Sequence, residues 1–323
     1  MFWVSLLVGV LAVVQDGNVL TVVQDGNVLT VAQDGSGDFR AVQAALDALP
    51  AAGGEIRIKP GIYREVLHIR KDHVQLTGSD GVVLDYGNHT GLRLPTGDTV
   101  NTWTSASCFI EGDDFRADNL TFENDAGFTA GQAVAVMVNG NRAAFFHCRL
   151  IGNQDVLFCS GPGTKQYYED CYIEGTTDFI FGAATAVFNK CHIHSKKNSH
   201  VTAASTPREI PYGFVFLDCR LSADTNIHKV SLGRPWQPYA SVTYIRCWMG
   251  SHIVPEGWNN WKNPDNEKTA RYAEYGSTGP GASPSTRAPW ARQLSPEDAA
   301  GVTVDAVLGD WLPDTRPEGR QTR

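Results

Sequence analysis

The chain has 323 residues, a formal net charge of −8 and a hydrophobic content of 42 %. An acidic chain without a basic stripe argues against nucleic acids and anionic membranes as partners. No Pro/Ser-rich linker or charged run interrupts the middle of the chain, so we expect one elongated domain with a continuous core.

The first residues are apolar and then repetitive. Residues 1–14 carry no charge, and they match the core of a signal peptide while being too short to span a membrane. This favours export to a secreted or periplasmic location. The sequence VVQDGNVLT then occurs at 13–21 and again at 22–30. We assign 1–30 to a leader with a nonapeptide duplication, 31–314 to the functional domain and 315–323 to a tail.

A short helix is the first element expected in the domain. Asp38 is predicted to cap it, its apolar stripe is Val42, Leu46 and Leu49, and it ends before Pro50. A helix with one apolar stripe is suited to covering the open end of a β-sheet.

Strands follow this helix along most of the chain. Apolar and polar residues alternate at Glu55–Lys59 and Tyr63–Ile69, as in half-buried strands. From Val74 to Met249, short strand-like runs recur between turns rich in Gly, Asn and Asp. After Pro255, aromatic residues lie among Gly and Pro, which predicts a long loop on the side of the domain, followed by a short helix from about Pro296.

Five segments share one six-residue pattern. An aromatic residue comes first, any two residues follow it, then a cysteine, any one residue and an apolar residue. Successive cysteines lie 23, 20, 28 and 28 residues apart. Strand-sized repeats with variable loops predict an all-β stacked coil, or solenoid. The segments are Phe145–Leu150, Tyr168–Ile173, Phe188–Ile193, Phe216–Leu221 and Tyr244–Met249.

The cysteines allow two interpretations. The chain has seven, so at least one is unpaired within the chain. Cys171 and Cys191 occupy equivalent places in neighbouring repeats, where stacked Cα atoms would fall within disulfide range. A ladder of buried free thiols fits the same spacing. Spacing alone leaves both open.

Two acidic residues recur at one place in the repeat. Asp155 and Asp178 each follow a repeat cysteine by seven residues, and Gln132, Asp155 and Asp178 are spaced by 23 residues. We expect these three side chains to stack about 4.8 Å apart, the strand spacing. A turn cap is the alternative for a single Asp, but the repeated offset favours function. Two stacked carboxylates would titrate unequally, with one pKa raised and the other lowered.

The neighbours of this acidic pair indicate its chemistry. A carboxylate pair also suits a retaining glycosidase, but the amides of Gln132 and Gln154 favour an oxyanion at a carbonyl centre. Arg234 can hold a carboxylate ionised, and Trp236 offers a face for a sugar. The Gly-x-Ser-x-Gly, phosphate-loop and His-Glu-x-x-His patterns are absent from the sequence.

Together these residues resemble the pectin methylesterase family, in its short form without an inhibitor-like region. The resemblance runs from about Val31 to Trp311 and includes five segments in the family's order and spacing. They are Gly61-x-Tyr63-x-Glu65, Gln132-Ala133-Val134-Ala135, Gln154-Asp155-x-Leu157, Asp178-Phe179-Ile180-Phe181-Gly182 and Leu232-Gly233-Arg234-Pro235-Trp236.

The resemblance implies a right-handed parallel β-helix with a short N-terminal capping helix and long C-terminal loops. It implies hydrolysis of methyl esters in pectin without a metal or other cofactor. We expect the protein to be a monomer. By matching motif, Asp178 is the nucleophile and Asp155 the general acid, then base. Gln132 and Gln154 form the oxyanion site, and Arg234 holds Asp178.

The resemblance also implies residues that contact the sugar, namely Trp236, Phe181, Phe158, Thr102 and Trp261. Some family members have a disulfide at the place of Cys171 and Cys191. One departure from the family pattern is Val156, which stands where Thr is usual and is expected to affect the pKa of Asp155 or the rate. The rival functions are a β-helix glycosidase, a calcium-dependent lyase and a carbohydrate-binding coil without catalysis.

Overall fold

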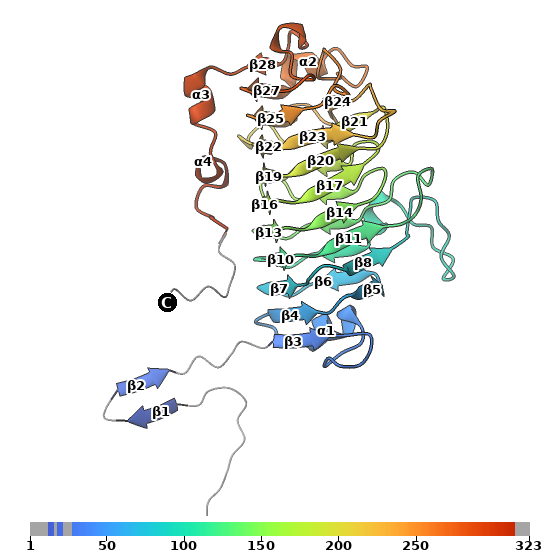
Figure 1. Ribbon diagram of the computed structural model, residues 1–323, viewed down its shortest axis with the longest axis vertical. Coiled ribbons are helices and arrows are strands. Elements are labelled where there is room, and N and C mark those ends of the chain that lie inside the picture. Colours follow the sequence, from blue (N-terminus) through green and yellow to red (C-terminus); the bar gives the residue numbers. More distant parts are fainter. Residues whose placement is uncertain (1–11, 16–17, 22–27, 314–323) are drawn as a thin grey trace, which may run out of the picture.

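The computed structural model describes residues 12–15, 18–21 and 28–313. Three parallel sheets run along a stack of coils, and each full coil adds one strand to each sheet (Figure 1). The described domain is therefore a parallel β-helix. Its core lies inside the coil, where inward-facing side chains from all three sheets meet in one continuous cluster.

The three sheets contain eleven, eight and seven strands among the described residues. The first sheet consists of β3 (Val28–Val31), β4 (Gly54–Ile58), β7 (Val74–Thr77), β10 (Arg116–Asp118), β13 (Ala143–Phe146), β16 (Lys165–Glu169), β19 (Thr185–Asn189), β22 (Phe214–Leu217), β25 (Ser241–Ile245), β27 (Arg271–Tyr275) and β28 (Arg292–Gln293). The second consists of β5 (Gly61–Arg64), β8 (Val82–Tyr86), β11 (Thr121–Asn124), β14 (Arg149–Ile151), β17 (Tyr172–Gly175), β20 (His192–Ser195), β23 (Arg220–Ala223) and β26 (Trp248–Met249). The third consists of β6 (Leu67–Ile69), β9 (Cys108–Ile110), β12 (Val136–Val138), β15 (Leu157–Cys159), β18 (Ile180–Gly182), β21 (His200–Ala204) and β24 (Ser231–Pro235).

The aromatic residues of the repeat form a stack inside the core, which confirms the predicted coil. The rings of Phe145, Tyr168, Phe188, Phe216 and Tyr244 follow one another at centroid distances of 4.8, 4.7, 4.5 and 4.4 Å. Their planes differ by 10° or less. Offset stacking of this kind adds to the burial energy of each ring, so the repeat fixes the register of successive coils.

The cysteine of each repeat follows a sharp corner between the first and second sheets. All seven cysteines are free and buried, so of the two interpretations left open for Cys171 and Cys191, the structure contradicts the disulfide. The thiols of Cys171 and Cys191 instead donate to main-chain carbonyls of the preceding coil: Cys171 Sγ to Phe145 O at 3.5 Å, and Cys191 Sγ to Tyr168 O at 3.4 Å. The alternative, a ladder of small apolar thiols, is the one observed.

The N-terminal elements differ in part from the expectation. Strands β1 (Ala12–Gln15) and β2 (Asn18–Thr21) pair antiparallel, while residues 1–11 of the expected leader lie outside the described residues. Strand β3 begins at Val28, three residues before the expected start of the domain at Val31, so the end of the second nonapeptide copy lies in the first sheet.

The first helix, α1 (Val42–Ala48), lies at the N-terminal end of the coil as predicted (Figure 1), but Asp38 does not cap it. The Asp38 carboxylate accepts from the amide and hydroxyl of Thr30 instead. Glu65 accepts from the Val42 and Gln43 amides at 2.8 and 3.0 Å. A residue from the next coil therefore satisfies the helix amides that the local sequence leaves free.

The run expected as one strand at Tyr63–Ile69 is two strands. β5 ends at Arg64 in the second sheet, and β6 begins at Leu67 in the third. Tyr63, Leu67 and Ile69 are all buried, so the alternation continues through the corner between the sheets. Alternation alone cannot reveal such a corner, because the inward face stays the same.

The C-terminal part is more regular than a long loop. β27 and β28 extend the first sheet after Pro255, and the segment also contains α2 (Asn266–Thr269) and η2 (Pro284–Thr286). The expected helix is α3 (Pro296–Ala300), capped by Ser295 and followed by α4 (Val304–Leu308). Both helices pack an apolar cluster against the outer face of the first sheet (Figure 1). The expected tail lies outside the described residues.

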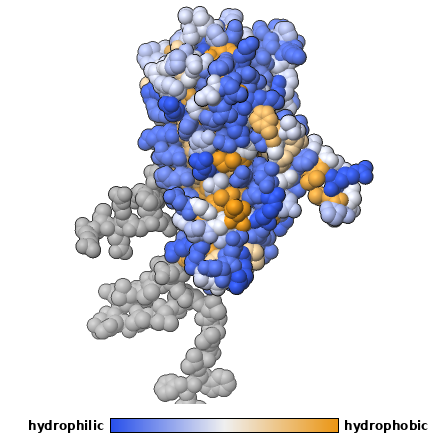
Figure 2. All heavy atoms as spheres, turned by 45° about the vertical axis from the view of Figure 1, so that its right-hand side comes forward, coloured by the Kyte–Doolittle hydropathy of each residue, from blue (hydrophilic) through white to orange (hydrophobic). Residues whose placement is uncertain are grey.

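The visible surface is hydrophilic over most of its area, with hydrophobic side chains in small groups (Figure 2). This agrees with strands that alternate between the core and the exterior. None of the helices in the described ranges is long and apolar enough to cross a membrane.

Candidate active site

Asp155 and Asp178 occupy equivalent corners at the start of β15 and β18. Leu157 pairs with Ile180 in register, so each acid lies two residues before a paired position. Both have left-handed backbone, with φ of 64° and 50°, a conformation that Asp tolerates better than most residues. The two carboxyl groups therefore meet in one cleft on the third sheet, as predicted from their spacing.

Gln132 does not continue this row, so the predicted three-residue stack is wrong. The amides of Ala135 and Val136 both donate to the carbonyl of Val156, which marks a β-bulge with two residues opposite one. The extra residue shifts Gln132 into register with Gln154. The two glutamines thus form their own row beside the acids, and both line the same cleft.

Arg234 binds Asp178 with two hydrogen bonds. Its Nε lies 2.9 Å from Oδ1 and its Nη2 lies 2.5 Å from Oδ2 of the carboxylate. This bidentate geometry fixes the orientation of the carboxylate and favours its ionised form. Strand β24 supplies Arg234 two coils beyond Asp178 in the same sheet, and the Trp261 ring lies over the guanidinium, with Cζ 3.6 Å from the ring centroid.

Asp155 and Asp178 are both buried, and neighbouring charges give them different affinities for a proton. Asp155 and Asp178 are 8 % and 5 % exposed. Burial, reinforced by the charge of Asp178, raises the pKa of Asp155 to about 8. Burial also raises the pKa of Asp178, although Arg234 opposes that rise. The two acids therefore titrate unequally, as predicted, and Asp155 binds its proton more tightly. The expected lowering of the Asp178 pKa is wrong, because the effect of desolvation outweighs that of the Arg234 guanidinium.

Aromatic side chains surround the acids. Of the predicted sugar-contacting residues, Thr102, Phe181, Trp236 and Trp261 line the cleft. Phe158 is not among the lining residues; its ring stacks beside Phe181, with centroids 4.5 Å apart.

Sequence reasoning missed two residues of the cleft wall, Trp103 and Ala203. The Trp103 ring is 5.1 Å from Phe158 and stacks on Trp236 at 5.9 Å. It lies on the short helix η1 (Thr102–Thr104), which the Asn101 side chain caps. In the sequence its position next to Thr102 could have marked Trp103, and in the structure its side chain is 48 % exposed.

His200 is a further titratable residue beside the pair, and its main-chain carbonyl accepts from the Asp178 amide at 2.8 Å. Burial lowers the pKa of His200 to about 4, with Arg234 acting in the same direction. Its ring is therefore neutral near pH 7. The described residues contain no group of three or more His, Cys, Asp or Glu side chains placed to hold a metal ion.

Comparisons with known proteins identify the family of this chain. The family model described as Pectinesterase matches residues 28–310. Pectinesterase 31 of Arabidopsis thaliana is 39 % identical over 276 residues, covering 82 % of this chain and 86 % of that protein.

Solved structures are similar as well. Pectin methylesterase from carrot matches with a TM-score of 0.81 and 31 % identity, over 88 % of this chain and 94 % of that one. A pectin methylesterase in complex with hexasaccharide VII matches with a TM-score of 0.80 and 30 % identity, over 90 % and 98 %. The fold is the right-handed parallel β-helix expected from the resemblance, and the chain belongs to the pectinesterase family of carboxylic ester hydrolases.

Proposed function

We propose that this chain hydrolyses the methyl esters of galacturonate units in pectin, releasing methanol and pectate, with Asp178 as nucleophile. The observation that carries the assignment is the bidentate contact of Arg234 with Asp178, beside a second acid whose pKa is raised to about 8. This arrangement offers one carboxyl group oriented by a guanidinium and, at neutral pH, one protonated carboxyl group in the same cleft.

In the first half of the reaction, a carboxylate oxygen of Asp178 attacks the ester carbonyl carbon. The amide groups of Gln132 and Gln154 donate hydrogen bonds to the oxyanion that develops. The carbon–oxygen bond to the methoxy group then breaks, and Asp155 gives its proton to the departing methanol. An acyl-enzyme anhydride remains on Asp178.

In the second half, Asp155 is ionised and takes a proton from a water molecule that attacks the sugar carbonyl of the anhydride. The bond to Asp178 breaks, which restores its carboxylate and leaves a free galacturonate carboxyl group. Asp155 is protonated again. The raised pKa of Asp155 suits both steps, because a general acid and base works best when its pKa lies near the working pH.

The aromatic side chains are proposed to bind the sugar rings. Trp236 and Phe181 face the cleft, and Trp103 closes it from the side of η1. Aromatic faces suit the apolar faces of sugar rings. Because pectin is a cell-wall polymer, we propose an extracellular location for the chain; the monomeric state stays a prediction.

A methanol-release assay on methylated pectin tests the assignment. Asp178→Asn is expected to abolish methanol release while the variant keeps the wild-type circular dichroism spectrum. Full activity in that variant would reject Asp178 as the nucleophile. A chelator is expected to leave the wild-type rate unchanged. New reducing ends, or unsaturated ends absorbing in the ultraviolet, would instead indicate a glycosidase or a lyase.

A further inference from the structure

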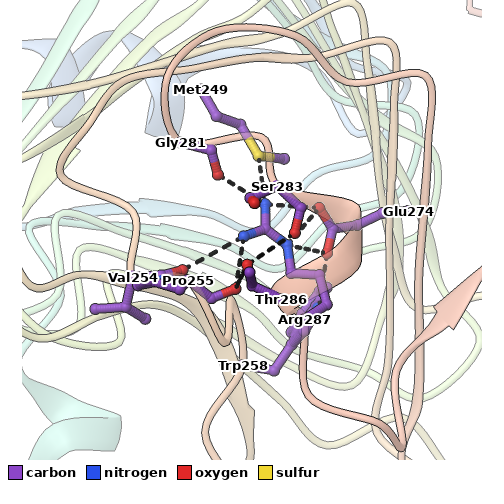
Figure 3. Close-up of polar contacts among 9 residues, drawn as sticks. All are labelled: Met249, Val254, Pro255, Trp258, Glu274, Gly281, Ser283, Thr286 and Arg287. Atoms are coloured by element: carbon purple, nitrogen blue, oxygen red, sulfur yellow. Dashed lines mark hydrogen bonds and ion pairs between the residues drawn. The ribbon is translucent and has the colours of Figure 1, made fainter.

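A buried ion pair lies at the C-terminal end of the coil (Figure 3). Arg287 Nε is 2.9 Å from Glu274 Oε1, and Arg287 Nη2 is 3.1 Å from Oε2. The two side chains are only 2 % and 5 % exposed. Neither residue lines the cleft that holds the two acids.

Arg287 also joins segments that are distant in the sequence. Its guanidinium donates to the Pro255 carbonyl at 3.1 Å and to the Gly281 carbonyl at 2.8 Å (Figure 3). Gly257, with φ of 69°, passes so close that a Cβ there would lie 2.6 Å from Arg287 Cδ. The chain therefore bends tightly around this guanidinium between Pro255 and Gly257.

Stability alone is a weak reason for such a pair. Removing two charges from water is costly, and replacing a buried ion pair by apolar residues is often neutral or stabilising. The contacts of Glu274 give a more specific role. Its Oε1 also accepts from Trp258 Nε1 at 2.9 Å, and the buried Trp258 ring stacks on Tyr272 at 4.3 Å. The pair thus fixes the orientation of Trp258.

The segment around Trp258 pairs with the strand that carries Arg234. The Leu232 amide donates to the Gly257 carbonyl at 2.7 Å, and the Asn259 amide donates to the Gly233 carbonyl at 3.1 Å. Residues 257–259 therefore extend the third sheet beside β24. Two residues further, the ring of Trp261 covers the Arg234 guanidinium.

We propose that Glu274 and Arg287 are positioning residues for the reaction: through Trp258 they hold residues 257–259 against β24, and so set the place of Arg234. The inference rests on the proposed roles of Asp178 and Arg234. Neither Glu274 nor Arg287 is required to touch the substrate.

The expected consequence is a looser contact between Arg234 and Asp178 when the pair is disturbed. A carboxylate less well held by the guanidinium has a higher pKa, so the acidic limb of kcat/KM should move to higher pH. Arg234 is the side chain that opposes the rise of the Asp178 pKa; the other titratable residues near it are Asp155, His200 and Tyr272. Burial keeps His200 neutral near pH 7, by lowering its pKa to about 4, and keeps the Tyr272 hydroxyl protonated by raising its pKa.

A matched pair of substitutions tests this link. Trp258→Phe keeps a ring but removes the hydrogen bond to Glu274. Tyr272→Phe keeps the ring stacked on it and removes a hydroxyl for which no partner occurs in the described residues. We expect Trp258→Phe to lower kcat about tenfold, the scale of a sub-ångström misplacement, and to shift the acidic limb upward. Tyr272→Phe should keep the wild-type pH profile.

Glu274→Gln and a remote control separate positioning from loss of stability. Glu274→Gln should change kcat and the acidic limb in the same direction as Trp258→Phe. Phe122→Leu, in the buried core at β11, should lower the melting temperature without changing the pH profile of the folded enzyme. The proposal is overturned if Trp258→Phe and Glu274→Gln melt lower but keep the wild-type kcat and acidic limb, as Phe122→Leu does.

Asp178→Asn separates a failure of the proposed function from a failure of the positioning role. Activity in Asp178→Asn would refute the proposed function, and with it the basis of this inference. An inactive Asp178→Asn together with wild-type kinetics in Trp258→Phe and Glu274→Gln would refute only the positioning role.

Discussion

Replacing Asp155 by Asn should stabilise the fold while it removes activity. Burial raises the pKa of Asp155 from 3.8 to about 8, so the folded state binds its proton more tightly than the unfolded state does. A shift of about 4 units corresponds to about 5 to 6 kcal/mol at about 1.36 kcal/mol per unit. Asn has a similar shape and no charge to bury, so it avoids this cost.

The effect should depend on pH in a defined direction. Below pH 3.8 the carboxyl group is protonated in both states, and wild type and Asp155→Asn should have similar stability. As the pH rises from 3.8 to about 8, the unfolded state alone releases the proton, so the wild type loses stability relative to the variant. Above about 8 the difference should reach its plateau.

Melting curves measured across this pH range test the argument. With an unfolding entropy of about 0.7 kcal/mol/K, from about 2.1 cal/mol/K per residue, the plateau corresponds to as much as about 8 °C. Asp114→Asn is the matched control, because the hydrogen bonds from Arg142 lower the pKa of Asp114. That carboxylate stabilises the fold above its unfolded pKa, so Asp114→Asn should melt lower at neutral pH. A difference between Asp155→Asn and wild type that is independent of pH would refute the reasoning.

Three further predictions concern the rate and the core. The value of kcat/KM should fall as the pH rises through about 8, where Asp155 loses its proton, and should fall at acidic pH as Asp178 gains one; a profile flat through pH 8 would contradict the role of Asp155. Val156 is fully buried in the core, so Val156→Thr should lower stability by about 1 to 3 kcal/mol through an unpaired hydroxyl, measured by denaturant unfolding. Val156 does not line the cleft, so in contrast to the expectation from the family pattern we predict an unchanged rate of methanol release, and a changed rate would contradict this second prediction. Because the cysteines are free, a reductant should leave the melting temperature unchanged, and the unfolded chain should titrate seven thiols; fewer would indicate a bridge such as Cys171–Cys191.

The coil and the acidic pair could be predicted because both depend on local spacing. Asp155 and Asp178 share a register, so an interval of 23 residues places them together. The same interval fails for Gln132, because Val136 pairs with Leu157 at an interval of 21 residues and the bulge raises this only to 22, at Gln132 and Gln154. A bulge depends on which carbonyl two amides share, and the sequence pattern does not contain that information.

Contacts between residues that are distant in the sequence could not be predicted either. The amides at the start of α1 are satisfied by Glu65 rather than by Asp38, although both residues are acidic. The role of Glu274 depends on Arg287 and Trp258, which come together only after the last coils have formed. Single-sequence patterns give strand positions, whereas these pairings depend on the closed tertiary structure.

Each of the two acids carries two local free-energy costs, which interactions with the surrounding coils must offset. Each has left-handed backbone and each is buried, and both conditions disfavour an isolated Asp. The next coil fixes each corner, since the Asp155 amide donates to Thr177 O at 3.1 Å and the Asp178 amide to His200 O at 2.8 Å. The site therefore requires the coils that follow it as well as those that contain it. This gives a physical reason for activity to be sensitive to residues at the C-terminal end of the stack, far along the chain from either acid.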